Sequence, residues 1–292
     1  PLQFIQEVRD LEAKGFSIRD RLFVDANATL IHQVRHQDNE GGVRGYAHQA
    51  IGSTGEGVGP ARMGRMARTT VRDLAWAKVE LVRDCDALFD DEAITICDTT
   101  KLVNEWIDEG RRVLLEGTQG AGLDLIHGNW PYVTSWGTTA AQLAADAGIA
   151  PQMVDTLLVA RTHPIRVYGN SGPMDHEISW DDLGVEPEKT TVTQKQRRIG
   201  TFEDKLYRKA VMLNRPVGVA VTFLDYIEKV PGDKFQESAR LGHLHTLGGD
   251  IHEFLVRLEN MGPPVAMGSV GPQQIIERRW WHGHTTSQVV RF

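Results

Sequence analysis

Cysteine is scarce in this 292-residue chain, which contains only Cys85 and Cys97. Two cysteines without CxxC spacing exclude a disulfide framework and suit a reducing compartment. No apolar run reaches the ~18–20 residues of a membrane-spanning helix, and no signal-peptide pattern is present. Cations are outnumbered, with 32 Lys and Arg against 39 Asp and Glu and a net charge of −7, which argues against non-specific nucleic-acid binding. We therefore expect a cytoplasmic protein that binds neither nucleic acid nor a membrane.

Helix-like segments alternate with short apolar runs along the chain. An apolar segment at 22–24 predicts a first strand. Each later helical pattern leads into an apolar run: 102–109 into 112–116, 205–213 into 217–224, and 251–260 into 265–269. This alternation predicts an α/β fold with a mainly parallel central sheet flanked by helices. Ligands of such sheets bind at the carboxyl ends of strands, so the loops after Glu116, Leu224 and Met267 are the candidate sites.

A glycine-rich segment at 52–60, GSTGEGVGP, precedes a helical segment with several arginines. Its backbone N–H groups and the hydroxyls of Ser53 and Thr54 can bind an anion at the start of that helix. Arg65 and Arg68 share one helix face, where both can reach the same anion. A flexible turn before a solvated basic helix is the alternative, since the segment is neither a Walker A sequence nor GxGxxG.

Gln119 follows the apolar run at 112–116 and lies between two glycines. Its amide carries both a donor and an acceptor, which suits the lactam edge of a purine. The polar stretch that follows contains Asp124 and the segment WPYVTS at 130–135, which includes Thr134. A tight turn with a surface glutamine explains the same residues.

Residues 170–196 form a long polar stretch without periodicity, which is typical of a functional or disordered loop. The stretch runs into TTVTQKQRR at 190–198, with three hydroxyls and three cations in nine residues. Guanidinium groups pair with carboxylates through two hydrogen bonds, so this segment suits a carboxylate ligand. An ordinary solvated loop is the alternative.

Two further segments follow predicted strands. Asp225 ends the run at 217–224 and can accept hydrogen bonds from guanine N1–H and its 2-amino group, or it can cap the next turn. Ser269 begins the turn SVGP, which can line the same base. HxH pairs such as His243 and His245 lack neighbouring acidic or cysteine ligands in the sequence. We expect them to be structural rather than metal ligands.

In this order, the segments resemble the adenylosuccinate synthetase family along nearly the whole chain. Six motifs correspond: GSTGEGVGP at 52–60 to G-[ST]-T-x-x-G-[IV]-G-P, EGTQG at 116–120 to EG-x-QG, WPYVTS at 130–135 to YP-[FY]-VTS, TVTQKQRR at 191–198 to T-x-T-G-R-x-RR, TFLD at 222–225 to T-x-LD, and SVGP at 269–272 to S-T-GP. Each alone is weak, but six in the right order make chance a poor explanation. The resemblance implies a P-loop-NTPase-like α/β fold, one domain over 1–292, and a homodimer.

The resemblance also implies a reaction and roles for single residues. The family is a C–N ligase that joins L-aspartate to C6 of IMP through a 6-phosphoryl intermediate, with GTP and Mg²⁺. Residues implied to bind the substrate nucleotide are Ser53, Thr54, Gln119, Thr134, and Arg68 from the other subunit, with Gln119 as the catalytic contact to the 6-oxo group. Residues implied to bind aspartate are Thr191, Thr193, Lys195 and Arg197. Residues implied to bind the donor base are Asp225, Ser269, Gly271 and Pro272.

The chain departs from the family pattern at several of these positions. Gln194 and Lys195 stand where the family has Gly-Arg, which removes a bidentate carboxylate contact. Phe223 stands where many members have Lys, and Gln273 replaces an Asp. The segments RTHPIRVYGNSGP and TFLDYI look closer to the shorter archaeal and phage-type members. Some phage members act on dGMP, with ATP as donor, to form 2-aminoadenylosuccinate.

The family's GDEGKGK loop, with its catalytic acid and metal ligand, and its catalytic His have no counterpart in this sequence. The chain starts at Pro1 inside a helical pattern, so we expect a preceding segment to supply them and expect no metal ligand in the chain itself. Three hypotheses remain open: the IMP ligase, the dGMP ligase, and an inactive nucleotide-binding fragment.

Overall fold

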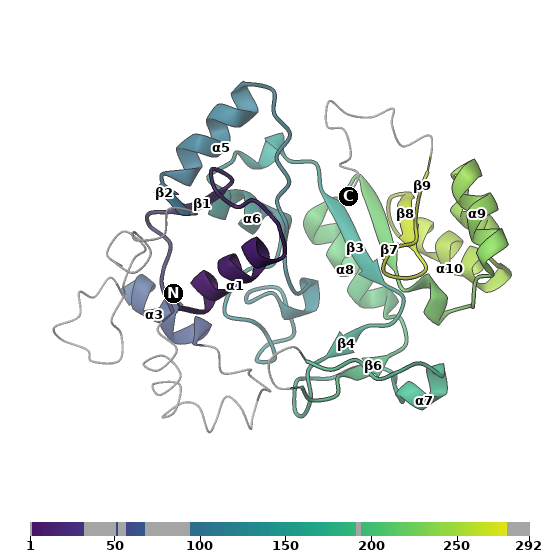
Figure 1. Cartoon of the computed structure of the whole chain (residues 1–292). Helices are drawn as coiled ribbons and strands as arrows, with labels where there is room; N and C mark the ends of the chain where they lie inside the picture. The colour runs from purple at the N-terminus through teal and green to yellow at the C-terminus, as the bar shows by residue number, and fades with distance from the viewer. Residues whose placement is uncertain (1, 32–50, 52–56, 68–93, 191–193, 279–292) are drawn as a thin grey trace. The chain divides into compact units, whose positions relative to one another are not determined.

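A computed structural model describes residues 2–31, 51, 57–67, 94–190 and 194–278 (Figure 1). The chain divides into two compact units. The first unit comprises Pro1–Leu115 with Ala147–Ile149, and the second comprises Glu116–Asp146 with Ala150–Phe292. The single domain expected over 1–292 stays a prediction.

The first unit is built on a pair of parallel strands. Its elements are α1 Leu2–Ala13, β1 Leu22–Asp25, α3 Val58–Ala67, β2 Ile94–Cys97 and α5 Thr99–Asp108. Leu22 of β1 lies opposite Ile94 of β2, and Ile5 and Val8 of α1 are buried in the same apolar cluster as Ile94. The predicted strand at 22–24 is confirmed. Gly15 adopts a φ of 88° just beyond the end of α1, a backbone conformation that favours glycine.

Asp25 ties the end of β1 to the start of α5. Its carboxylate accepts hydrogen bonds from Asn27 N (2.7 Å), Thr99 N (3.0 Å) and Thr99 Oγ1 (2.9 Å). Burial raises the pKa of Asp25, but these hydrogen bonds outweigh it and leave the pKa below its usual value. Asp98 caps α5 by accepting from Lys101 N. Two carboxylates, those of Asp25 and Asp98, therefore hold the junction at the start of α5, where the helix dipole favours negative charge.

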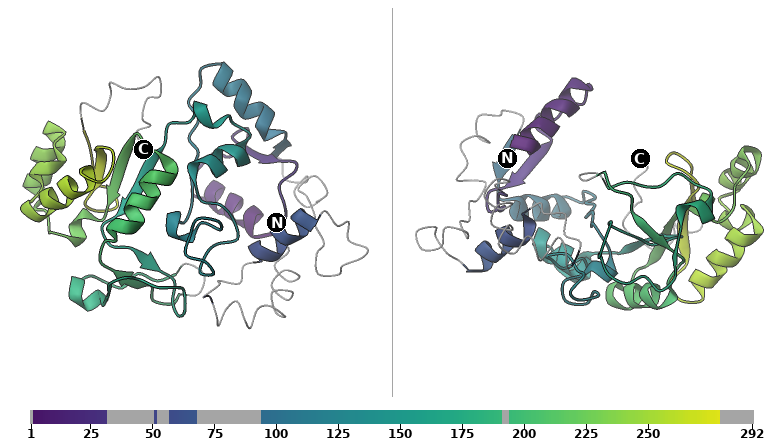
Figure 2. Two further views of the ribbon diagram at one scale, coloured as in Figure 1. Left: turned by 180° about the vertical axis from the view of Figure 1, so that it is seen from behind. Right: turned by 90° about the horizontal axis from the view of Figure 1, so that it is seen from below.

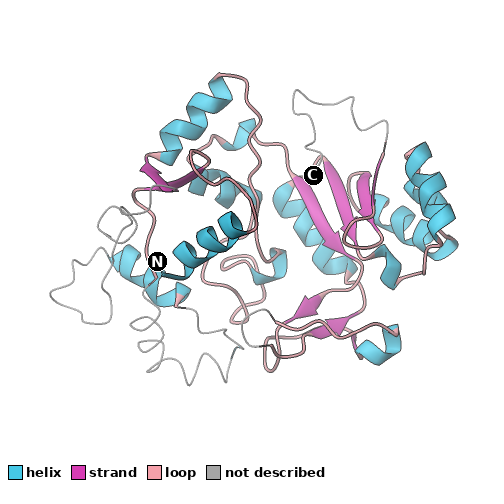
Figure 3. Ribbon diagram, viewed as in Figure 1, coloured by secondary structure: helices cyan, strands magenta, loops and turns pink. Residues whose placement is uncertain are grey.

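The second unit contains two sheets and the helices that pack on them (Figure 3). Its strands are β3 Leu157–Arg161, β4 Ile165–Arg166, β5 Glu177–Ile178, β6 Arg198–Gly200, β7 Gly218–Thr222, β8 Val265–Ser269 and β9 Ile275–Glu277. Its α-helices are α6 Ala140–Ala147, α7 Trp180–Leu183, α8 Asp204–Asn214, α9 Gly232–Leu241 and α10 Gly249–Glu259. Its 3₁₀ turns are η2 Ala121–Leu123, η3 Pro151–Met153, η4 Leu224–Tyr226 and η5 Leu244–Thr246.

The larger sheet has the order β3-β7-β8-β9. The first three strands are parallel, and β9 runs antiparallel to β8. Helices α8 and α10 lie on one face of it (Figure 2), where Arg257 pairs with Asp204 at 2.7 Å and Phe254 packs on Phe202. The smaller sheet, β4-β6-β5, is antiparallel. The predicted α/β class with a mainly parallel sheet is confirmed.

One predicted strand is wrong. Residues 112–116 have no strand partner within the part of the chain that the structure describes, and Leu114 is 65% exposed. Apolar alternation shows only that a segment can fit a sheet face. A strand also needs a neighbour that takes up its backbone donors and acceptors.

The core of the second unit fixes the turn that follows β7. Val219 and Val221 of β7 are almost fully buried with Leu255 of α10. Gly268 of β8 lies so close to Leu224 of η4 that a Cβ there would come within 2.8 Å of its side chain. A larger residue at position 268 would therefore displace the Leu224 side chain. This close packing places Asp225, the next residue, at the carboxyl edge of the sheet.

Candidate active site

Three segments emerge together where the parallel strands end. They are residues 161–163 after β3, 223–226 after β7, and 269–272 after β8. Since these strands are neighbours in the sheet, their carboxyl ends share one edge, where ligands of such sheets bind. The predicted donor-base residues Asp225, Ser269, Gly271 and Pro272 all belong to the second and third segments.

Asp225 carries an unsatisfied acceptor at this edge. Its Oδ1 is buried and has no hydrogen-bond partner among the described residues. Leaving a buried polar atom unpaired costs about 1–3 kcal/mol, and more for a charged group. A ligand that donates an N–H to this oxygen would remove the cost.

Phe223, two residues before Asp225, has a strained backbone with a φ of 63°. Two neighbours from the β3 end support it. Thr162 Oγ1 donates to the Phe223 carbonyl at 2.7 Å, and the guanidinium carbon of Arg161 lies 3.9 Å from the centre of the Phe223 ring. The aromatic ring at this position is therefore covered by a cation.

Residues 188–190 and 194–197 lie side by side and are called the basic hairpin below; the second arm holds the predicted aspartate-binding residues Lys195 and Arg197. Lys189 and Gln196 form an antiparallel bridge, and Thr190 N donates to Lys195 O at 2.9 Å. Lys195 Nζ lies 5.1 Å from the centre of the Tyr168 ring. Gln194 adopts a φ of 54°, which explains why the resembled family has glycine there.

Arg197 is fixed through both ends of its backbone. Its N–H donates to Glu188 O at 2.8 Å, and its carbonyl accepts from the indole of Trp180 at 2.7 Å. Trp180 is 2% exposed and is the first residue of α7. Ser179 and Asp182 cap the N-terminus of this helix with a capping box. Although 170–196 was predicted to be a loop, this helix and β5 give it regular structure.

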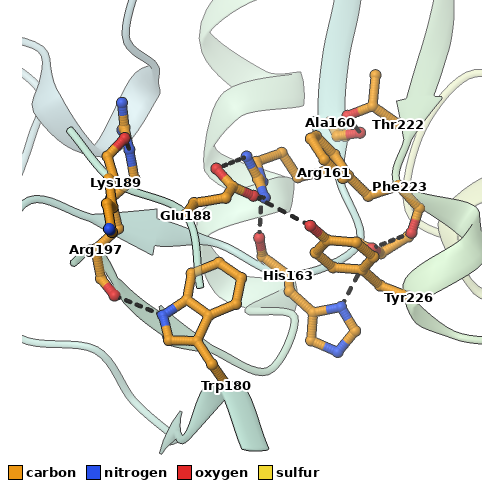
Figure 4. A network of polar contacts seen from close by, with 11 residues as sticks. Ala160, Arg161, His163, Trp180, Glu188, Lys189, Arg197, Thr222, Phe223 and Tyr226 are labelled. Atoms are coloured by element: carbon orange, nitrogen blue, oxygen red, sulfur yellow. Dashed lines mark hydrogen bonds and ion pairs between the residues drawn. The ribbon is translucent and has the colours of Figure 1, made fainter. Parts of the chain in front are cut away.

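Glu188 connects the hairpin to the sheet edge (Figure 4). Its carboxylate accepts hydrogen bonds from Arg161 Nη2 at 2.5 Å and Nη1 at 3.3 Å, and Tyr226 OH lies 3.4 Å away. Burial and then the charge of Glu188 raise the pKa of the Tyr226 phenol. The predicted aspartate-binding and donor-base segments are thus joined through one carboxylate.

The predicted purine-binding residues Gln119 and Thr134 belong to one loop, residues 117–139. Buried Asp124 organises it by accepting from His127 N (2.7 Å), Thr138 N (2.6 Å) and Ile126 N (3.0 Å). Burial raises the pKa of Asp124, but these hydrogen bonds leave it lowered overall. Thr134 N donates to Leu123 O at 2.8 Å, whereas Gln119 is exposed at a φ of 69°.

Several predicted positions, Ser53, Thr54, Arg68, Thr191 and Thr193, lie outside the described residues. Their roles remain predictions.

Arg65 of α3, the partner of Arg68 in the predicted anion site, lies within the described residues. It donates hydrogen bonds to Asn27 O and, at 3.0 Å, to Thr29 Oγ1.

No group of three or more His, Cys, Asp or Glu side chains suited to a metal ion occurs among the described residues. In the same residues, no helix combines the length and apolar character needed to cross a membrane.

An open hollow of about 510 Å³ lies beside the same edge. Its lining residues are Thr162, His163, Phe202, Ile227, Asp250, Glu253, Phe254 and Arg257. None of these is a predicted site residue. Burial, followed by the charge of Arg161, lowers the pKa of His163 and favours its neutral form.

Sequence reasoning missed the residues that hold the site together: Arg161, Trp180 and Glu188. The capping box at Ser179 and Asp182 was a readable sign of a helix at Trp180. Arg161 and Glu188, which form an ion pair, lie 27 positions apart in the sequence. No local pattern indicates this pair.

Comparison with known proteins identifies the family. The family model described as adenylosuccinate synthetase matches residues 1–84 and 76–235. The adenylosuccinate synthetase of Pyrococcus horikoshii is 34% identical over 286 residues, which cover 96% of this chain and 76% of that protein. The enzyme of Methanocaldococcus jannaschii is 34% identical over 281 residues, covering 94% and 73%.

Solved structures agree. The cyanophage S-2L succinoaminodeoxyadenylate synthetase (PurZ), bound to dGMP and to dATP as an energy donor, has a TM-score of 0.68 at 28% identity, covering 88% of this chain and 69% of that one. The fully ligated adenylosuccinate synthetase of Plasmodium falciparum shares the fold, with a TM-score of 0.71 at 18% identity and coverages of 94% and 82%. Together with the ordered motifs, these matches show that the chain belongs to the adenylosuccinate synthetase family.

Proposed function

We propose that this chain acts as a C–N ligase that joins L-aspartate to C6 of IMP and uses GTP as the phosphoryl donor. Family membership supports the reaction class. The observation that carries the choice of donor is the unsatisfied, buried Oδ1 of Asp225 at the carboxyl edge of the sheet. Guanine presents N–H donors at N1 and at the 2-amino group, whereas adenine N1 is an acceptor. An ionised Asp225 therefore complements guanine.

The remaining residues have matching chemical tasks. The γ-phosphoryl group moves from GTP to O6 of IMP, and the amine of aspartate then attacks C6. The C6–O6 bond breaks as the C6–N bond forms, and phosphate leaves with O6. The amide of Gln119 would hydrogen-bond the 6-oxo region, and Lys195 and Arg197 would bind the aspartate carboxylates. Mg²⁺, when bound, would spread the charge of the transferred phosphoryl group.

The test is an exchange of substrates with the purified enzyme. IMP and dGMP are each supplied with aspartate and with either GTP or ATP, and the nucleotide product is identified by mass. We expect adenylosuccinate from IMP and GTP, with a slower reaction from ATP. Aspartate-dependent turnover in none of the four mixtures would refute the proposal and favour an inactive nucleotide-binding chain.

A second candidate is the ligase that acts on dGMP with ATP. It is favoured by the 28% identity to the cyanophage enzyme whose structure holds dGMP and dATP. It is also favoured by Phe223, which replaces the lysine that many family members have. The aspartate adduct of dGMP carries a 2-amino group and lacks the 2′-hydroxyl of adenylosuccinate. Its formation from dGMP, faster with ATP than with GTP, would establish this activity instead.

We also propose that the enzyme is a cytoplasmic homodimer in which Arg68 reaches the nucleotide of the other subunit. Closed two-fold dimers let each subunit complete its partner's site. An Arg68→Leu protein mixed with a Gln119→Ala protein should regain activity, because one site of the heterodimer has both residues. No recovery despite demonstrated subunit exchange would place Arg68 within its own subunit.

A further inference from the structure

Glu188 is the point where three separate segments of the second unit meet. Its backbone carbonyl binds Arg197 N of the basic hairpin, and its carboxylate binds Arg161 at the end of β3. Tyr226, the residue after Asp225, approaches the same carboxylate. The side chains of Arg161 and Glu188 are only 22% and 25% exposed, so solvent screens their attraction less than it screens a surface pair.

Arg161 contributes a second contact of a different kind. Its guanidinium covers the ring of Phe223 and also donates from Nε to His163 O at 3.0 Å. A left-handed backbone at a bulky residue persists only where its surroundings hold it. The salt bridge holds the guanidinium over the Phe223 ring, and Phe223 begins the turn that carries Asp225.

We propose that Arg161 and Glu188 are positioning residues that fix the basic hairpin to the segment 223–226. Resting on the proposed function, this pair makes one rigid link between the aspartate subsite and the donor-base subsite. Neither residue touches a substrate. Each acts through its neighbours: Glu188 through the backbone of Arg197, and Arg161 through Phe223.

The experiment is a double-mutant cycle in the active enzyme with Glu188→Gln, Arg161→Met and the double variant. Each single change should raise both the KM for aspartate and the KM for GTP by about tenfold, and the double variant should be no worse than the poorer single one. Should either single variant fail to fold, Tyr226→Phe removes only the hydroxyl beside Glu188. It should raise both KM values by about twofold.

Arg278 and Glu259 provide a matched control. They form an Arg–Glu pair at 2.5 Å, with exposures of 12% and 25%. Glu259 also binds Val265 N, the first residue of β8, which puts this pair at the opposite edge of the sheet. Arg278→Met should lower the melting temperature and leave both KM values unchanged.

The outcomes separate the inference from the function on which it rests. Variants of Arg161 and Glu188 that lose stability and keep both KM values, as expected of Arg278→Met, overturn the inference. A change in the KM for aspartate alone also overturns it, because the link to the donor-base segment would be absent. A wild-type enzyme without aspartate-dependent turnover refutes the proposed function instead. In that case the dissociation constant of GTP is measured for the same set of Arg161 and Glu188 variants.

Discussion

The indole N–H of Trp180 donates to the carbonyl of Arg197 across 2.7 Å, from the first residue of a four-residue helix to the base of the basic hairpin. This bond and the one from Arg197 N to Glu188 O define the path of the backbone on both sides of Arg197. The Cα atom from which the Arg197 side chain extends is therefore held in a fixed position.

Trp180→Phe keeps an aromatic ring in the buried position and deletes the N–H. We expect a loss of about 1 kcal/mol in the free energy of unfolding, as for one neutral hydrogen bond. We also expect a several-fold increase in the KM for aspartate with little change for GTP. Steady-state kinetics and urea unfolding measure both effects.

Trp136→Phe is the matched control, because Trp136 also donates its indole N–H, to Asp146 at 2.7 Å. It should leave the KM for aspartate unchanged. Equal effects of the two substitutions would contradict a specific role for Trp180.

Gln194→Gly should stabilise the protein or leave its stability unchanged. A left-handed φ costs a side-chain-bearing residue roughly 1–2 kcal/mol, while the added freedom of glycine in the unfolded chain costs about 0.4–1 kcal/mol. Gln196→Gly is the comparison, since Gln196 pairs with Lys189 in extended backbone and gains nothing from glycine. Urea denaturation should rank Gln194→Gly as the more stable variant, and the reverse order would refute the strain argument.

Gln119→Ala should lower kcat by about 10²–10³, the usual effect of removing one hydrogen bond made in the transition state. Since Gln119 is exposed, the melting temperature should change by little. Near-normal turnover in this folded variant would remove Gln119 from the list of catalytic contacts.

Asp225→Asn should change the choice of donor. The amide has only one oxygen and carries no charge, so it loses a charge-assisted bond to guanine worth about 1.5–3 kcal/mol. The kcat/KM for GTP should fall by about 10- to 100-fold, while the KM for aspartate stays within a factor of about two. An unchanged preference for GTP over ATP in competition would mean that Asp225 does not read the base.

His245 should make stability depend on pH. Burial and Arg278 lower its pKa, Glu259 opposes them, and His252 lowers it further. The neutral form is therefore favoured in the fold, and its contribution is complete above the unfolded pKa of about 6.5 and lost as the pH falls through the folded pKa. His245→Gln should flatten the dependence of the unfolding free energy between about pH 7 and 5. His176→Gln, at an exposed position, should keep the wild-type slope.

Local patterns predicted several of the regular elements. The strand at 265–269 has the predicted bounds, and the helices predicted at 205–213 and 251–260 are found as α8 and α10 with ends shifted by one or two residues. Side-chain periodicity carries this information because each face of an element is buried or exposed as a unit. The strand predicted at 112–116 was wrong because periodicity does not reveal whether a partner strand exists.

The candidate site was predictable only where its residues lie within short motifs. Asp225 lies just after β7 and Ser269 ends β8, so the edge they share follows from the order of the sheet. Arg161 and Glu188 could not be predicted, because the pair depends on how the chain returns to the end of β3 after residues 162–187. The sequence showed that Phe223 departs from the family pattern. The contact between its ring and the guanidinium of Arg161 could be found only in the structure.

Two short hydrogen bonds hold residue 197 in place through its main-chain atoms, and one longer bond, from Arg197 Nε to Lys189 O at 3.4 Å, uses its side chain. The course of the hairpin therefore depends mainly on main-chain atoms of residue 197, and varying its side chain removes only the longer bond to Lys189. A library at this one codon, screened with glutamate, asparagine or cysteate in place of aspartate, is a practical route to ligases that attach other amines to a purine.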